Sequence, residues 1–409
     1  MRIKSNSFEC TSNGKTIRGL EFRPAGGSGG SGTGSTGSGT GGLPIMIVSH
    51  GFMANWMTTV AYAVQWAMQG FCAYCFDFVG GGFGIRSDGK LKDMTVRTEV
   101  EDLKNVILHA KAQPYTDSNE LYLMGCSQGG VVSALTAAEL GTDAVKKLVL
   151  FYPAMCIPDD AWSGKMVFFK FDPDNVPDRV GFGPMTIGGN YIKVAQNMDI
   201  FKEISKYTGP VFIAHGTKDG IVPFEYGRKA YEAYKAAGAD AVFMTCPRAP
   251  HGWPNFGPTD RDAFFAAKEF VLKDKRLIMD VDVKLTGLEP LKLRGLINDV
   301  RVPFVGTSKT DYFEGEIQPG AYDTQKYLGV IPVKITAVYT LKGKDYTGQA
   351  CTVDIVNKFN VLKGFAWHPD MKTDSEALKA VNGQLCDALF SLTKYPFHGP
   401  RIRVFAKDQ

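Results

Sequence analysis

Ser127, which lies between Gly125 and Gly129, is the residue whose surroundings most clearly indicate a chemical role. Residues 125–129 read Gly-Cys-Ser-Gln-Gly and fit the pattern G-x-S-x-G, with Ser127 at its centre. A strand-like apolar run at 121–124 precedes this pattern, and a helix-like run at 129–139 follows it. Strand, sharp turn and helix together are typical of a nucleophile elbow, which exposes a serine hydroxyl at the edge of a sheet. The alternative is a glycine-rich turn with an incidental serine, and the context favours the elbow.

A serine hydroxyl is a weak nucleophile and needs a base. Where such an elbow occurs, the acid follows the serine in the chain and the histidine follows the acid. His251 follows an apolar run at 241–246, and Asp219 follows one at 211–215. We therefore predict that His251 is the base and that Asp219 fixes its tautomer. Loop aspartates are commonly only solvated, but the strand-end position favours the catalytic role.

The negative charge that develops on the substrate oxygen needs preorganised N–H donors. The backbone of Gln128, directly after the serine, is predicted to supply one. The loop at 50–55, His-Gly-Phe-Met-Ala-Asn, follows another apolar run and is predicted to supply the second from Phe52. His50 is predicted to support this loop, and His215 to be structural or to act behind the catalytic residues.

Strand-like and helix-like runs alternate through most of the chain. This order, with apolar runs that read as buried on both faces, indicates a mainly parallel sheet covered by helices. The predicted fold is an α/β-hydrolase over residues 1–277, with a small inserted lid at 153–200. Predicted strands are 15–23, 43–49, 72–76, 121–124, 147–151, 211–215 and 241–246; predicted helices are 59–69, 95–111, 129–139, 224–237 and 260–273.

The pattern changes near residue 280. Alternating and β-branched runs between glycines and prolines predict a small, mainly β C-terminal domain over 278–409. Residues 374–392 predict one late amphipathic helix. Residues 26–42 contain only Gly, Ser and Thr. Such a tract is a flexible coil, and we assign it no function.

Composition excludes several classes of function. The chain of 409 residues is 44% hydrophobic and 22% charged, with a formal charge of +4 and no basic cluster, so no nucleic-acid partner is expected. No apolar run is long enough to span a bilayer, and no signal peptide is visible, so we expect a cytoplasmic location. Cys72 and Cys75 have redox or metal spacing, but buried strand residues are favoured, and no cofactor or metal is expected.

With these residues in place, the chain resembles the bacterial cinnamoyl (feruloyl) esterases over about residues 1–275. The segments that carry the resemblance are 50–52 (His-Gly-Phe), 76–82 (Phe-Asp-Phe-Val-Gly-Gly-Gly), 86–89 (Arg-Ser-Asp-Gly), 125–130 and 215–219 (His-Gly-Thr-Lys-Asp).

The resemblance implies a lid that binds a phenolic ring, with Asp160 and Tyr191 near the ring hydroxyl. The lid aromatics, Trp162 among them, offer stacking area for an aromatic acyl group or serve only to anchor the lid. Residues 166–169, Met-Val-Phe-Phe, depart from the polar lids of the family, so recognition of the hydroxyl is expected to differ.

Three hypotheses follow. The first is a serine esterase that releases hydroxycinnamic acids (ferulate, p-coumarate, caffeate) from plant-derived esters, with a small aromatic ester or a feruloylated oligosaccharide as substrate. The second is a general short-chain carboxylesterase, an acetyl esterase or a peptidase. The third gives the C-terminal domain a carbohydrate-binding or dimerisation role. That domain weakly resembles small β-barrel domains of unknown function through residues 313–321.

Overall fold

The computed structural model divides into two compact units, one over Ile3–Ala263 and one that begins at Phe264. The tract at 26–42 lies outside the described residues except for Gly42. The described residues are 3–25, 42–255, 257–272, 277–294, 297–328, 331–360, 368–378, 387–391 and 401–405.

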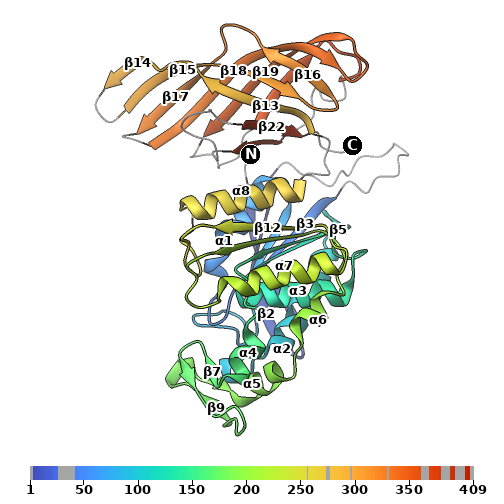
Figure 1. The fold of residues 1–409 in the computed structure, drawn as a ribbon, viewed down its shortest axis with the longest axis vertical. Coiled ribbons are helices and arrows are strands. Elements are labelled where there is room, and N and C mark those ends of the chain that lie inside the picture. The colour runs from blue at the N-terminus through green and yellow to red at the C-terminus, as the bar shows by residue number, and fades with distance from the viewer. Residues whose placement is uncertain are drawn as a thin grey trace. The chain divides into compact units, whose positions relative to one another are not determined.

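The first unit is built on a sheet of eight strands in the order β1-β2-β4-β3-β5-β6-β11-β12 (Figure 1). Strands β1, β2 and β4 pair antiparallel, and all pairs from β4 to β12 are parallel. The mainly parallel α/β sheet predicted from the sequence is confirmed. The strands are β1 (Ile3–Ser12), β2 (Lys15–Pro24), β3 (Leu43–Ser49), β4 (Cys72–Asp77), β5 (Thr116–Cys126), β6 (Lys147–Phe151), β11 (Val211–Gly216) and β12 (Ala241–Cys246).

Helices cover both faces of this sheet, with α1 on one face and α2, α3 and α7 on the other (Figure 1). Helix α2 shows why these segments are helical. Thr95 caps its first turn by accepting from the Thr98 N–H, and its buried residues recur every three or four positions. The elements are α1 (Val60–Met68), α2 (Val96–Lys111), α3 (Gln128–Leu140), α7 (Phe224–Ala236), α8 (Pro258–Leu272) and the short turns η1 (Trp56–Thr58) and η2 (Leu91–Asp93).

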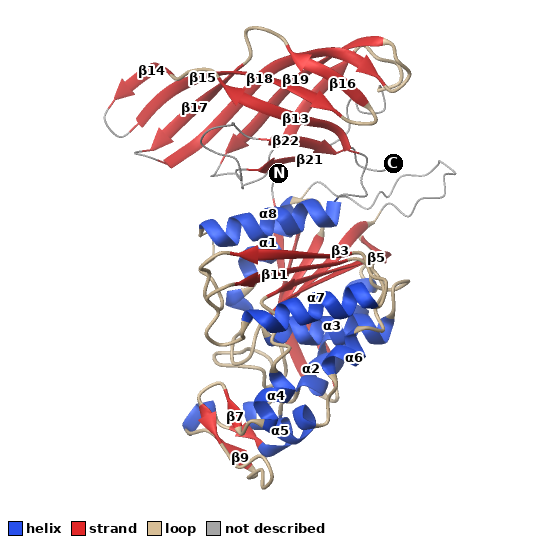
Figure 2. Cartoon of the chain, in the orientation of Figure 1, coloured by secondary structure: helices blue, strands red, loops and turns tan. Residues whose placement is uncertain are grey.

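The lid lies between β6 and β11 as a set of short elements (Figure 2). Helix α4 packs against α5. Two small hairpins, β7 with β8 and β9 with β10, complete the lid. Its elements are α4 (Ile157–Trp162), β7 (Lys165–Met166), β8 (Phe169–Lys170), β9 (Arg179–Val180), η3 (Gly183–Met185), β10 (Ile187–Gly188), α5 (Gly189–Gln196) and α6 (Ile200–Ile204).

The second unit contains an antiparallel sheet with the path β20-β19-β18-β16-β15-β13-β22-β21. Strand β14 pairs with β15, and β17 pairs with both β15 and β18. Its apolar core includes Val281, Phe304, Leu341 and Ile355. The strands are β13 (Leu277–Leu285), β14 (Glu289–Arg294), β15 (Ile297–Lys309), β16 (Phe313–Ile317), β17 (Tyr322–Leu328), β18 (Ile331–Asp345), β19 (Ala350–Asn360), β20 (His368–Thr373), β21 (Asp387–Ser391) and β22 (Arg401–Phe405).

The late helix predicted over 374–392 was wrong in the part that the structure describes. Residues 387–391 form strand β21, which pairs antiparallel with β22. Helical periodicity is only weak evidence for a helix, and pairing with a neighbouring strand can decide the structure of a segment against it. Residues 379–386 lie outside the described residues.

In the described parts of the chain, no helix combines the length and the apolar character needed to cross a bilayer.

Candidate active site

The backbone at Ser127 is strained in the way that a nucleophile elbow requires. Ser127 has φ 54° and ψ −122°, between the end of β5 and the start of α3. A Cβ atom on Gly125 would lie 2.1 Å from the Gly129 carbonyl oxygen, and one on Gly129 would lie 2.3 Å from the His50 carbonyl oxygen. Both glycines are therefore needed for the tight turn, and the strain is held at the residue that carries the hydroxyl.

The structure brings together the three predicted catalytic side chains. His251 Nε2 lies 3.0 Å from Ser127 Oγ, and His251 Nδ1 lies 2.7 Å from Asp219 Oδ2. An ionised carboxylate only accepts hydrogen bonds, so Nδ1 carries the imidazole proton. Nε2 is then free to accept the proton of the Ser127 hydroxyl.

Asp219 is held as an anion by several donors. Its Oδ1 accepts from the backbone N–H groups of Ile221 and Val222, at 3.0 and 2.8 Å. Its Oδ2 lies 3.3 Å from His215 Nε2. Burial acts to raise the pKa of Asp219, but the hydrogen bonds from His215 and His251 outweigh burial and hold that pKa below its usual range. His215, which was predicted to be structural or to act behind the catalytic residues, thus contacts Asp219 directly.

Aromatic rings position His251. The ring of Tyr152 packs edge-on against the imidazole, with centroids 4.9 Å apart, and also contacts Trp253 at 4.6 Å. Trp253 donates from its indole N–H to Asp260 at 3.2 Å, and the Tyr62 hydroxyl donates to the same carboxylate. Hydrogen bonds therefore hold the loop that carries His251 and Trp253 to helices α1 and α8.

The loop after β3 passes directly over the nucleophile. A Cβ atom on Gly51 would lie 3.0 Å from Ser127 Cβ and 3.5 Å from Ser127 Oγ. Phe52 follows Gly51 and lines the cavity above the serine. The Gln128 N–H opens helix α3, where the first N–H groups have no acceptor within the helix. These placements suit the predicted pair of oxyanion donors, Phe52 and Gln128.

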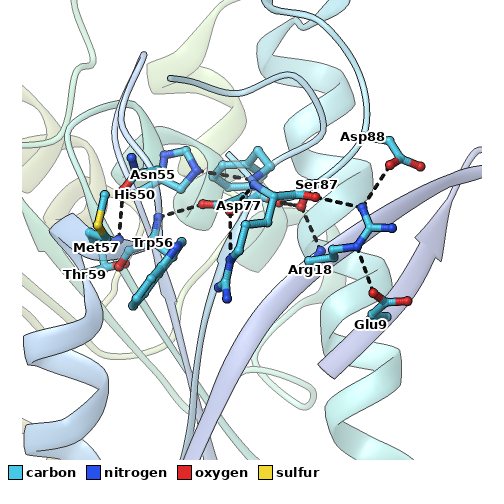
Figure 3. Close-up of polar contacts among 12 residues, drawn as sticks. Glu9, Arg18, His50, Asn55, Trp56, Met57, Thr59, Asp77, Ser87 and Asp88 are labelled. Carbon is cyan, nitrogen blue, oxygen red and sulfur yellow. Dashed lines mark hydrogen bonds and ion pairs between the residues drawn. The ribbon is translucent and has the colours of Figure 1, made fainter. Parts of the chain in front are cut away.

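His50 and Asp77 hold this loop from behind (Figure 3). The Phe78 N–H donates to His50 Nε2 at 3.2 Å, so Nδ1 carries the proton and donates to the Gly51 carbonyl at 2.8 Å. Burial lowers the pKa of His50, which keeps the ring neutral. Asp77 Oδ1 accepts from the Trp56 N–H at 2.8 Å, which fixes the far end of the loop. His50 thus supports the loop and does not act as a base.

Asp77 also joins this loop to the segment that follows β4. Its Oδ2 accepts from the Arg86 N–H at 2.8 Å, and its carbonyl accepts from the Ser87 hydroxyl at 2.6 Å. The Arg18 N–H donates to Ser87 Oγ at 2.8 Å (Figure 3). Strand β2 and the segment after β4 thereby hold the loop at 50–55, called here the oxyanion loop, in place.

A cavity of about 260 Å³ opens beside Ser127 and His251. Its wall is mostly apolar and comes from the oxyanion loop, the loop after β4, and the lid. The polar side chains that line it, apart from the catalytic pair, are Gln128, Cys156, Asp160 and Tyr191. Pockets of this kind fix a ligand with apolar walls and a few placed polar groups.

The three residues predicted to bind substrate are placed differently. Asp160 and Tyr191 line the cavity, whereas Trp162 is not among its lining residues. Trp162 is 57% exposed, and its indole N–H donates to the Gln196 carbonyl at 3.0 Å. That bond joins α4 to α5, so the contact seen for Trp162 anchors the lid.

Several cavity residues were missed at the sequence level. Phe83, Cys156 and Met185 form part of the wall without having been predicted, whereas the tip of the β7–β8 hairpin, Met166–Phe168, belongs to the lid segment already expected to affect recognition. Glu99 on α2 was also missed, although it contacts Gln128. A glutamate at a helical position whose neighbours on the same face are mostly apolar was the available signal for Glu99.

The residues that the structure describes include no group of three or more His, Cys, Asp or Glu side chains placed to hold a metal ion.

Comparison with known proteins agrees with this geometry. The model of the prolyl oligopeptidase family matches residues 56–272, more than half of the chain. The chain belongs to the prolyl oligopeptidase family. The matched residues include Ser127, Asp219 and His251, and the fold class and the enzyme class predicted from the sequence are confirmed. The chain is a serine hydrolase.

One similar protein was solved with ferulic acid, and another is an esterase by name. A solved structure titled ferulic acid bound to Est1E, from Butyrivibrio proteoclasticus, has a TM-score of 0.56 and 28% identity, covering 65% of this chain and 98% of that one. The caffeoylshikimate esterase of Arabidopsis thaliana is 25% identical over 279 residues, which is 59% of this chain and 78% of the relative. The predicted resemblance to feruloyl and cinnamoyl esterases is thus confirmed.

A third relative is named for the release of acylamino acids. The acylamino-acid-releasing enzyme of Mus musculus is 24% identical over 223 residues, which is 51% of this chain. The chain spans only 28% of the length of that relative.

Proposed function

We propose that this protein is a carboxylic ester hydrolase that releases hydroxycinnamic acids through an acyl-enzyme on Ser127. One observation carries the proposal: the cavity that opens at Ser127 and His251 has mostly apolar walls and is lined by one carboxylate residue, Asp160. Such a cavity suits an aromatic acyl group with a polar ring substituent. The esterase relatives support the same substrate class.

The chemistry follows from the catalytic distances. Ser127 Oγ attacks the ester carbonyl carbon while His251 Nε2 takes the hydroxyl proton, across the 3.0 Å contact. The N–H groups of Phe52 and Gln128 hold the oxyanion. The bond to the alcohol oxygen then breaks, and His251 returns its proton to that oxygen. Water, deprotonated by His251, attacks the acyl-enzyme and releases the free acid.

Asp160 supports recognition of a phenolic hydroxyl. Cys156 Sγ donates to Asp160 Oδ2 at 3.2 Å, which orients the carboxyl group within the cavity wall. Burial raises the pKa of Asp160, and the neighbouring Asp159 adds to that effect. A phenol hydroxyl that donates to Asp160 would replace part of the lost hydration. A ring without a hydroxyl would leave the carboxyl group without this partner.

Hydrolysis of N-acylated peptides is the second candidate, and the acylamino-acid-releasing relative favours it. The same catalytic residues serve both reactions, so only the acyl group and the leaving group differ. A general short-chain esterase is the third candidate, because small acyl groups also fit the cavity.

A substrate panel tests the proposal. The full-length protein is assayed with methyl ferulate, methyl cinnamate, p-nitrophenyl acetate and N-acetyl-alanine p-nitroanilide. We expect the highest kcat/KM for methyl ferulate. A higher kcat/KM for the acetate would favour the general esterase, and a higher one for the anilide would favour the peptidase.

For the C-terminal unit we propose a carbohydrate-binding or dimerisation role. If the substrate is a feruloylated oligosaccharide, a carbohydrate-binding unit would bind its sugar part. Residues 1–275 and the full chain are compared for activity, xylan binding and oligomeric mass. Equal values in all three measurements would contradict this role. We further propose a cytoplasmic location and no nucleic-acid or membrane partner, which cell fractionation and binding assays test.

A further inference from the structure

A chain of buried hydrogen bonds runs from the lid to a helix behind the nucleophile. The Tyr191 hydroxyl, on lid helix α5, donates to Gln128 Oε1 at 2.5 Å. Gln128 Nε2 donates in turn to Glu99 Oε2 at 2.7 Å, on α2. All three side chains are at most 1% exposed. Nothing in the triad mechanism uses Glu99.

The surroundings of Glu99 favour a neutral carboxylic acid. Glu99 Oε1 has no hydrogen-bond partner among the described residues. Burial raises the pKa of Glu99 well above its ordinary value, and the nearby Asp102 adds to this, although the bond from Gln128 opposes it. Burying an unpaired charge is far more costly than burying a neutral acid.

Glu99 also approaches the loop after β4, next to His50. A Cβ atom on Gly81 would lie 3.1 Å from Glu99 Oε1 and 3.3 Å from His50 Cε1. Glu99 and His50 therefore approach the same glycine, with His50 bonded to Gly51 and Glu99 bonded to Gln128. His50 therefore holds the loop that carries Phe52, and Glu99 holds the side chain of Gln128, the two predicted oxyanion donors.

We propose that Glu99 is a positioning residue for acyl transfer, which acts through Gln128 to hold the oxyanion-donating peptide and the lid residue Tyr191 as one unit. Gln128 contributes its backbone N–H to the oxyanion, while its side chain is bonded at both ends. Rotation of that side chain would break two buried hydrogen bonds. Movement of the lid at Tyr191 is thereby coupled to the donor beside Ser127.

The hydrogen bond to Gln128 also determines whether the Tyr191 hydroxyl can donate or accept a further hydrogen bond. Its hydroxyl proton is donated to Gln128, so the oxygen offers only acceptor capacity to the cavity that it lines. A ring hydroxyl on the substrate can donate to Tyr191 or to Asp160. A methoxy group at that point can donate to neither.

The test compares two substitutions of similar size at position 99. Glu99→Gln keeps a carbonyl oxygen that accepts from Gln128, whereas Glu99→Leu removes it. Glu101→Gln, at an exposed position on the same helix, is the control. The inference rests on the proposed ester hydrolysis, so two readouts are used: kcat and KM for p-nitrophenyl acetate, and the rate at which a small fluorophosphonate labels Ser127.

We expect Glu99→Gln and Glu101→Gln to keep wild-type kcat and labelling rate. We expect Glu99→Leu to lower both by about tenfold with little change in KM, since a misplacement of about 1 Å can cost roughly 100-fold. If Glu99→Leu does not fold, Gln128→Met breaks the same bonds from the other side and should give the same loss.

Wild-type kcat and labelling in Glu99→Leu, or equal losses in Glu99→Gln and Glu99→Leu, would overturn the positioning role. If methyl ferulate is a poor substrate for every form but labelling follows the expected order, the role of Glu99 stands and the aromatic substrate is wrong.

Discussion

His251 Nδ1 lies 2.7 Å from Asp219 Oδ2, and the side chain of Asp219 has no solvent-exposed surface. This contact decides which imidazole nitrogen faces the serine. The proton sits on Nδ1 because the carboxylate cannot donate, and Nε2 is left as the base. The hydrogen bonds to Asp219 also keep this carboxylate ionised while His251 gains and loses its proton.

Asp219→Asn should leave the fold intact and lower kcat by roughly 10⁴-fold, because an amide can donate to Nδ1 and favours the wrong tautomer. The measurement is kcat for methyl ferulate at neutral pH. Asp143→Asn, a surface change of the same kind, serves as the control. An Asp219→Asn enzyme within tenfold of wild type would be inconsistent with this role.

The buried acid at Glu99 should make stability depend on pH with a definite sign. Its pKa is raised in the folded protein, so above about pH 4, where an ordinary Glu ionises, the native state binds more protons than the unfolded state. The stability contributed by Glu99 is present below that pH and is lost as pH rises toward its folded pKa.

Glu99→Gln removes this ionisation. The free energy of unfolding is measured with urea from pH 4 to pH 8. The value for Glu99→Gln should increase relative to that of wild type as pH rises. The free energy of unfolding of the Glu101→Gln control should show the same pH dependence as that of wild type. A Glu99→Gln protein that loses stability relative to wild type toward pH 8 would show that Glu99 is ionised in the native state.

Gly51→Ala should impair catalysis more than folding. The added Cβ atom would lie 3.0 Å from Ser127 Cβ, which forces the oxyanion loop or the serine to shift. A shift of this kind should lower kcat by about tenfold or more. Gly287→Ala meets only Pro303, at 3.4 Å and beyond, and should leave kcat unchanged. Equal kcat values for the two variants would refute the close approach at Gly51.

Asp160→Asn should alter selectivity among ring substituents. A hydrogen bond to a charged group contributes about 1.5–3 kcal/mol, so its loss should lower kcat/KM for methyl ferulate by about tenfold or more. Methyl cinnamate, which has no ring hydroxyl, should be affected far less. If both substrates change by the same factor, Asp160 does not bind the ring hydroxyl.

The catalytic residues and seven of the eight strands of the main sheet were predictable from sequence because each has a local signature, whereas the edge strand β1 was not predicted. The elbow is marked by Gly125 and Gly129, and the strand ends mark the positions of Asp219 and His251. The parallel strands are short apolar runs between amphipathic helices. Strand β5 begins at Thr116, before the apolar run predicted at 121–124, because its first residues are partly exposed and lack an apolar signal.

The rest of the site depends on contacts between residues far apart in the chain. Nothing near Glu99 indicates that it meets Gln128, and nothing near Tyr152 indicates that it packs on His251. Sequence left Trp162 open as a stacking surface for the acyl group or as an anchor of the lid, and the bond from its indole N–H to Gln196 supports the anchor. Likewise, the strand at 387–391 depends on its pairing with β22, which helical periodicity does not reveal.

Ser127→Ala removes the hydroxyl that forms the acyl-enzyme. The measurement is kcat/KM for methyl ferulate, with circular dichroism to verify that the variant is folded. We expect a folded protein whose turnover falls at least 10³-fold, the scale seen when a catalytic triad loses its nucleophile. A folded Ser127→Ala protein that still hydrolyses methyl ferulate at the wild-type rate would exclude Ser127 as the nucleophile.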